Sequence, residues 1–169
     1  MMKNLILLIL ILTFLSCTES SKYYSLDDFD KVEKMDVHIH VGTSRDAFVE
    51  QAKKDNFKLL NIVVDFTKGC KYIKNQCAFR LDQKSRHPEQ FEMVTAFSIK
   101  EWDDPNWVAN TIDWLDKCFN DGAVGVKVWK NIGMVFRDKN GELVMIDDPK
   151  LDTIFSYIEK RGKTLVGHL

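Results

Sequence analysis

The chain of 169 residues lacks several features that mark common functional classes. No glycine-rich loop follows its first predicted strand, so nucleotide binding through a dinucleotide fingerprint or a P-loop has no support. Acidic and basic residues are mixed along the chain and leave a net charge of −1. The sequence also lacks a zinc-finger or RNA-binding signature. These absences argue against nucleic acid as a partner.

The longest hydrophobic run is confined to the N-terminus. Lys3 is followed by an apolar run over residues 5–15, and the small residue Ser16 then precedes Cys17. This pattern predicts a secretory signal peptide over residues 1–16. The run is too short, and too abruptly polar afterwards, to predict a membrane-spanning helix.

The end of this leader, residues 14–17 (FLSC), resembles a loose lipobox of bacterial lipoproteins. The resemblance implies cleavage before Cys17 and a diacylglyceryl chain on its sulfur. The protein would then be exported, lipid-anchored to a bacterial membrane and facing the periplasm. Residues 17–29 would form a lipidated polar tether, and residues 30–169 one domain with a sizeable core. The alternative is a secreted protein in which Cys17 has no role.

Cysteine is scarce, and the three that follow the leader are Cys70, Cys77 and Cys118. They lack the paired spacing of a structural zinc site. An alternative is that Cys70 and Cys77 pair across a loop in an oxidising compartment, but the odd number argues against a disulfide-built fold. We expect all three to be buried as small apolar residues.

The rest of the sequence alternates between strand and helix patterns. Strands are predicted over residues 34–41, 58–66, 91–99, 123–129 and 164–168. Helices are predicted from a Ser44 cap to residue 55, over 73–85, from an Asp104 cap and Pro105 to residue 120, and from Asp148 and Pro149 to residue 161. Residues 133–147 are predicted to form a β-hairpin around an Asp-Lys-Asn-Gly turn. Such alternation predicts an α/β fold with parallel strands joined by right-handed crossovers.

Two architectures fit five parallel strands. One is an open doubly wound sheet, which would be complete at this length. The other is a parallel (β/α) barrel of the TIM type that is truncated after about five strands. The residues that carry chemistry decide between them.

The most informative stretch is the first strand, where Asp36, His38 and His40 alternate with apolar residues. Successive strand residues point to opposite faces, so these three are expected to share one face while Val37 and Ile39 pack against helices. Two imidazoles two residues apart can bind one ion. The alternative is a solvated strand face with two histidines that bind nothing.

Two later strands supply further candidate ligands. In the fourth strand, side chains alternate between the two faces, so Val126 and Val128 are expected to face the helices and Lys127 the other side. Burial there would lower the pKa of Lys127. A neutral amine can form a carbamate ligand with carbon dioxide, whereas a lysine paired with a carboxylate or facing solvent would not. In the fifth strand, His168 is placed at the leading end, in register with the first pair. His87, in a predicted loop, is expected to be solvated.

Three motifs occur in order on strands one, four and five: DVHIH at residues 36–40, GVKVW at 125–129 and VGHL at 166–169. Together they resemble the amidohydrolase superfamily, and most closely amidohydrolase family 2. That family consists of metal-dependent (β/α)8-barrel enzymes and includes aminocarboxymuconate-semialdehyde decarboxylase. The resemblance covers residues 34–169 and is densest over the block GAVGVKVWKNIG at 122–133.

The resemblance implies that His38, His40 and His168 bind a divalent metal, with zinc expected, and that Asp36 supports them from a second layer. Lys127 matches a lysine that is carboxylated and metal-bound in several subgroups, or it contacts the substrate. The family's strand-eight aspartate, its general base, has no counterpart here. The function that the resemblance implies is a metal-dependent hydrolase acting on a small-molecule substrate that contains a carbonyl-type group. A decarboxylase on the same barrel and a non-catalytic lipid-anchored fragment are the alternatives.

Overall fold

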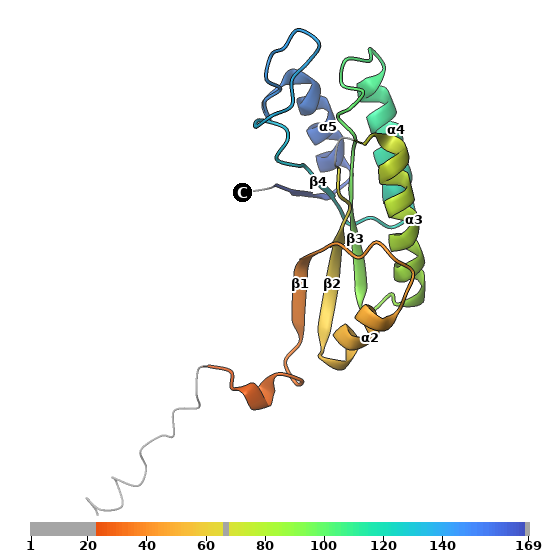
Figure 1. Cartoon of the computed structure of the whole chain (residues 1–169), viewed down its shortest axis with the longest axis vertical. Coiled ribbons are helices and arrows are strands. Elements are labelled where there is room, and N and C mark those ends of the chain that lie inside the picture. The colour runs from red at the N-terminus through yellow and green to blue at the C-terminus, as the bar shows by residue number, and fades with distance from the viewer. Residues whose placement is uncertain (1–22, 66–67, 168–169) are drawn as a thin grey trace, which may run out of the picture.

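The structure is a computed structural model that describes residues 23–65 and 68–167. In these residues five parallel strands form one sheet, and their order in the sheet is their order in the sequence (Figure 1). The strands are β1 (Lys34–Ile39), β2 (Phe57–Ile62), β3 (Phe91–Ala96), β4 (Gly125–Lys127) and β5 (Thr164–Val166). Each overlaps a predicted strand, so the α/β class with parallel strands is confirmed.

Helices connect consecutive strands of the sheet. Within the described residues these are α2 (Ala47–Lys54), α3 (Cys70–Arg86), α4 (Trp107–Asn120) and α5 (Pro149–Lys160), preceded by the short 3-10 helix η1 (Leu26–Asp28). Because neighbouring strands are also consecutive, right-handed crossovers place every helix on the same face. The sheet curls into a half-barrel with the helices on its outer side (Figure 1). A doubly wound sheet would reverse its strand order, so that alternative is wrong.

The main core lies between β3, β4 and the helices α3 to α5. Its fully buried side chains include Ile73, Met93, Leu115, Val126, Leu151 and Ile154. In α4 the buried residues recur at helical spacing, which is the pattern expected of an amphipathic helix on a sheet. Trp107 is buried and its indole N–H donates to the carbonyl of Ser98 at 2.8 Å, so this side chain is part of the core.

A second, smaller core joins α2 to the first three strands. Val49 and Ala52 of α2 pack with Ile39, Leu59 and Phe91. The two clusters together cover the outer face of the sheet.

Several predicted helix boundaries are wrong by a few residues. α4 begins at Trp107 with Asn106 as its N-cap, because the carboxylate of Asp104 accepts the amide of Asn106 at 2.8 Å in a turn that precedes the helix. α2 begins at Ala47 rather than directly after Ser44. α3 begins at Cys70, where a loop was predicted.

The end of the chain follows the sequence pattern more closely. Asp148 caps α5 by accepting the amide of Lys150 at 2.9 Å, and Pro149 is the first helical residue, as predicted. Gly162 ends the helix with a positive φ of 61°, a conformation that glycine adopts without strain.

The predicted hairpin over residues 133–147 is reduced to one antiparallel bridge between Arg137 and Leu143. The turn between Asp138 and Gly141 forms, with the Gly141 amide donating to the Asp138 carbonyl at 3.0 Å. The segment before it turns instead of extending, and the side chain of Val135 is 71% exposed. A strand without an apolar partner gains little from pairing, which explains why the excursion stays irregular.

The predicted signal peptide and Cys17 lie outside the described residues, so their roles stay predictions. The first described segment contains η1, before which the backbone amide and the hydroxyl of Ser25 both donate to the carboxylate of Asp28, at 3.0 and 2.9 Å. Phe29 then contacts Phe57 edge-to-face at 6.2 Å, so the folded body includes the end of the predicted tether. No helix in the described part of the chain has the length and hydrophobicity needed to span a membrane.

Gly125 sits where β4 and β5 approach each other closely. A Cβ added there would lie 2.6 Å from the carbonyl oxygen of its pairing partner Thr164. We therefore expect Gly125→Ala to lower the free energy of unfolding by about 1–3 kcal/mol, measured by urea denaturation, because the strands must move apart. Gly42→Ala is the control: nothing lies within 4 Å of that Cβ, so it should be neutral or slightly stabilising. Equal effects of the two changes would contradict this account.

Candidate active site on the inner face of the sheet

The residues predicted to carry chemistry come from the carboxyl ends of β1 and β4, on the inner face of the half-barrel. Parallel strands end at one edge of the sheet, so residues far apart in sequence meet there. His38 and His40 come from β1 and the residue after it, and Lys127 is the last residue of β4. The structure brings these three together through one further residue, Trp129.

The first strand contains a β-bulge that decides which side chains face inward. Asp36 is opposite Leu59, and Ile39 is opposite Asn61, so β1 uses one residue more than β2 over this stretch. Asp36 and Ile39 therefore share the helix-covered face, although they are three residues apart. The prediction that Asp36 lies on the face of both histidines is wrong, because uninterrupted alternation stops at the bulge.

The bulge also changes the environment of Val37, which is 57% exposed and does not pack against the helices as predicted. Asp36 instead supports the bulge: its carboxylate accepts the backbone amide of His38 at 3.1 Å. Asp36 therefore acts on His38 through the main chain. Its predicted role in supporting metal ligands stays a prediction.

The two histidines form a pair at the strand end. Their rings meet edge-to-face with centroids 5.0 Å apart and planes at 87°. Nδ1 of His40 lies 2.9 Å from the carbonyl oxygen of Ile62, which can only accept a hydrogen bond. Nδ1 therefore carries the hydrogen, and in the neutral ring Nε2 presents a lone pair.

Trp129 links the histidine pair to the lysine. Its ring centroid lies 5.8 Å from that of His40, and the Nζ of Lys127 lies 5.3 Å from the same ring. Its indole N–H donates to the carbonyl of Val63 at 3.1 Å, which holds the ring across the strand ends. Sequence reasoning missed this residue. Its position two residues after Lys127, on the same face of the strand, was the signal that could have found it.

Lys127 is buried, with 2% of its surface exposed, and points to the inner face as predicted. Burial lowers its pKa, because the charged ammonium is poorly solvated there. Its Nζ donates to the carbonyl of Gly167 at 2.6 Å. Lys130, three residues further along the chain, is exposed beyond the strand end.

Arg80 is a second residue that sequence reasoning missed. It is 1% exposed on α3, and its Nη2 donates at 3.0 Å to the same Ile62 carbonyl that His40 contacts. Burial lowers its pKa to about 10, and no ion pair among the described residues involves it. Its position seven residues after Ile73 and three after Cys77 put it on the buried stripe of α3, which was the available signal.

The remaining predicted ligands are placed as follows. His168 lies outside the described residues; Gly167, the residue before it, contacts Lys127. Among residues 23–65 and 68–167, no three or more His, Cys, Asp and Glu side chains are grouped so that they could hold a metal ion. His87 is away from the strand ends, where its Nε2 lies 3.0 Å from Asp46, so it takes no part in the site.

The chain was compared with protein families, with curated proteins and with solved structures. No protein-family model matches the chain, and the comparisons with curated proteins and with solved structures found no match either. The likeness to amidohydrolases therefore depends on the three sequence motifs.

The lowered pKa of Lys127 predicts a pH dependence of stability. Between its folded pKa and the unfolded value of about 10.4, the unfolded chain binds more protons. The free energy of unfolding should therefore gain a contribution from Lys127 as pH rises through this window. Lys127→Met, which removes the titrating group, should show a weaker rise in urea denaturation between neutral pH and about 10. Lys130→Met, at an exposed position, should keep the wild-type dependence, and equal slopes for all three proteins would show that Lys127 is not the cause.

Proposed function

We propose that the chain provides part of the active site of a metal-dependent hydrolase of the amidohydrolase type. The observation that carries the proposal is the hydrogen bond from His40 Nδ1 to the Ile62 carbonyl. A metal-binding imidazole characteristically donates its other ring N–H to such an acceptor, which orients the lone pair of Nε2. His38, at 5.0 Å between ring centroids, adds a second imidazole on the same face.

His38, His40 and His168 would hold the ion, and zinc suits a set of imidazole donors. When bound, such an ion lowers the pKa of a coordinated water to about 7 and polarises a carbonyl group of the substrate. The chain's own contribution is to orient the imidazoles. Asp36 fixes the backbone of His38, and the Ile62 carbonyl fixes the ring of His40.

Lys127 has two alternative roles in this proposal. Its lowered pKa favours the neutral amine, which can attack carbon dioxide to form a carbamate and release a proton. The carbamate would provide an anionic oxygen donor beside the histidines. Alternatively, the ammonium contacts an acidic group of the substrate, and Trp129 holds it in place through a cation–π contact.

The proposal also concerns the fold: the half-barrel would be part of an eight-stranded TIM-type barrel. The sequential strand order and the helices on one face only support this. The inner and edge surfaces also carry exposed apolar side chains, with Met35 58% and Leu165 44% exposed. Such surfaces are what further strands would cover. In this proposal the protein is exported and is anchored to a membrane by a lipid on Cys17.

The proposal is tested by zinc binding to the full chain. We expect purified protein to bind zinc in equilibrium dialysis and to hydrolyse members of a panel of esters and amides in a zinc-dependent manner. His38→Ala and His40→Ala should each weaken zinc binding by more than the ~10–100-fold that loss of an outer-shell partner costs. They should reduce hydrolysis in parallel.

His87→Gln is the matched control, because this histidine pairs with Asp46 away from the strand ends. It should leave zinc binding unchanged. Absence of zinc binding, or equal losses in all three variants, would rule out the proposed site. Zinc binding with carbon dioxide release from unsaturated carboxylic acids, and without hydrolysis, would establish the decarboxylase alternative. Zinc binding without either reaction would favour a non-catalytic fragment.

A further inference from the structure

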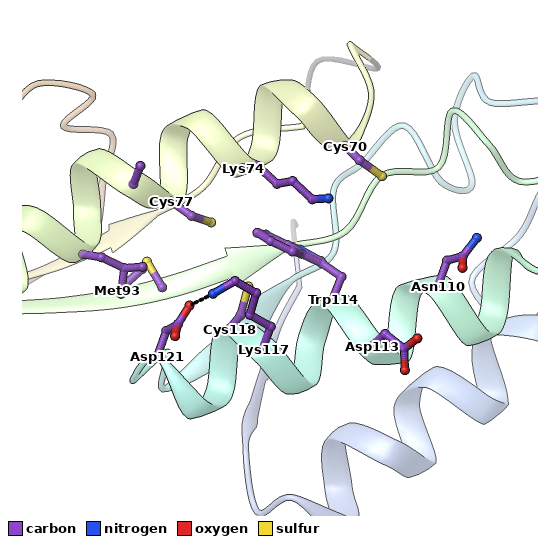
Figure 2. Close-up of a pocket in the computed structure, with 12 residues that line it drawn as sticks. Cys70, Lys74, Cys77, Met93, Asn110, Asp113, Trp114, Lys117, Cys118 and Asp121 are labelled. Carbon is purple, nitrogen blue, oxygen red and sulfur yellow. Dashed lines mark hydrogen bonds and ion pairs between the residues drawn. The ribbon is translucent and has the colours of Figure 1, made fainter.

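A separate group of side chains lies on the opposite, helix-covered side of the sheet. A groove of about 640 Å³ opens between α3 and α4, and Cys77, Met93 and Cys118 line it. Figure 2 shows the sulfur atoms of these three residues turned towards the space between the two helices. Sulfur-bearing side chains from α3, β3 and α4 therefore line one groove.

The two thiols are held by one hydroxyl group. Oγ1 of Thr95 donates to Sγ of Cys118 at 3.3 Å and lies 3.7 Å from Sγ of Cys77. Thr95 is fully buried, and the two cysteines are 3% and 2% exposed. The hydroxyl fixes both sulfur positions against β3, so the cluster is preorganised.

The surroundings favour negative charge at Cys77. The side-chain interaction between the two thiols lowers the pKa of Cys77 and raises that of Cys118. The buried guanidinium of Arg80, one helical turn after Cys77, lowers the pKa of Cys77 further. Arg80 has no carboxylate partner among the described residues, and its Nε has no hydrogen-bond partner. A thiolate at Cys77 would supply the missing negative charge.

An ordinary pair of buried cysteines has none of this context. Structural cysteines in apolar surroundings have a raised pKa and are inert. Here a groove reaches the pair, Met93 lines the same groove, and the buried guanidinium of Arg80 lowers the pKa of Cys77.

We propose that Cys77, Cys118 and Met93 form a binding site for a soft monovalent metal ion, Cu(I). Thiolate and thioether sulfurs select soft ions. A structural zinc site takes four ligands, and an iron–sulfur cluster takes four protein ligands, usually all thiolates. Two thiolates and one thioether suit the low coordination number of Cu(I). Binding replaces two S–H bonds with two Cu–S bonds and releases two protons to solvent, so it needs neither oxidant nor reductant.

Cys70 does not belong to the cluster, although it lines the same groove. It is exposed at the start of α3, seven residues before Cys77, and its thiol contacts Glu101 at 3.8 Å. Seven residues of helix rise about 10 Å, so the two sulfurs cannot share one ion. The same separation excludes the disulfide between Cys70 and Cys77 that the sequence left as an alternative. Cys70 is therefore the internal control for the experiment.

The test uses the full chain with Cys17→Ser and Cys70→Ser, which leaves Cys77 and Cys118 as the only thiols of the four in the sequence. Cu(I) is titrated without oxygen against a chromogenic Cu(I) chelator. We expect one copper ion per chain, with release of protons in weakly buffered solution. Cys77→Ser or Cys118→Ser should abolish tight binding, and Thr95→Val should weaken it by about 10–100-fold. Met93→Leu should weaken it without changing the number of ions bound.

A second measurement does not depend on the folding of variants. In the wild-type chain, Cu(I) should protect Cys77 and Cys118 from alkylation in peptide mass analysis, while Cys70 stays reactive. His38→Ala/His40→Ala should retain copper, which separates this site from the proposed zinc site. Absence of copper binding, or copper retained by Cys77→Ser/Cys118→Ser, would overturn the proposal. Formation of a Cys77–Cys118 disulfide, with no copper uptake by the reduced thiols, would also overturn it.

Discussion

Right-handed crossovers between sequential parallel strands are the constraint on which the rest of this structure depends. Because no strand breaks the sequential order, every helix lies on one face of the sheet. The covered face then holds the apolar core and the sulfur cluster beside Thr95. The uncovered inner face holds His38, His40 and Lys127. Helices on both faces would have buried the inner face and removed the site.

The carboxyl ends of β2 and β3 show a second recurring interaction. Strand carbonyls that lose their ladder partners are capped by side-chain donors. Ile62 receives His40 and Arg80, Val63 receives Trp129, and Ala96 receives Trp114 at 2.9 Å. Buried backbone oxygens need such partners, so the groups that finish the strands are also the groups that orient the proposed metal ligands.

Sequence pattern predicted much of the fold and part of the site. Lys127 faces inward because strict alternation holds through β4, and Asp148 with Pro149 begins α5 because a cap acts within one turn. Prediction failed where local pattern was not enough. The bulge in β1 changes the face of Asp36, and only the pairing with β2 reveals it. Trp129 and Arg80 were missed because their importance comes from carbonyls distant in sequence.

The sequence by itself determined the alternation of helix and strand, the inward face of Lys127 in the fourth strand, and the presence of histidines at one strand end. These features follow from periodicity and capping, which act over a few residues. Only the tertiary structure decided the one-sided curl of the sheet, the inward pairing of His38 with His40, and the meeting of Cys77 with Cys118. Each of these depends on segments separated by tens of residues, whose distances are set by strand register and helix packing.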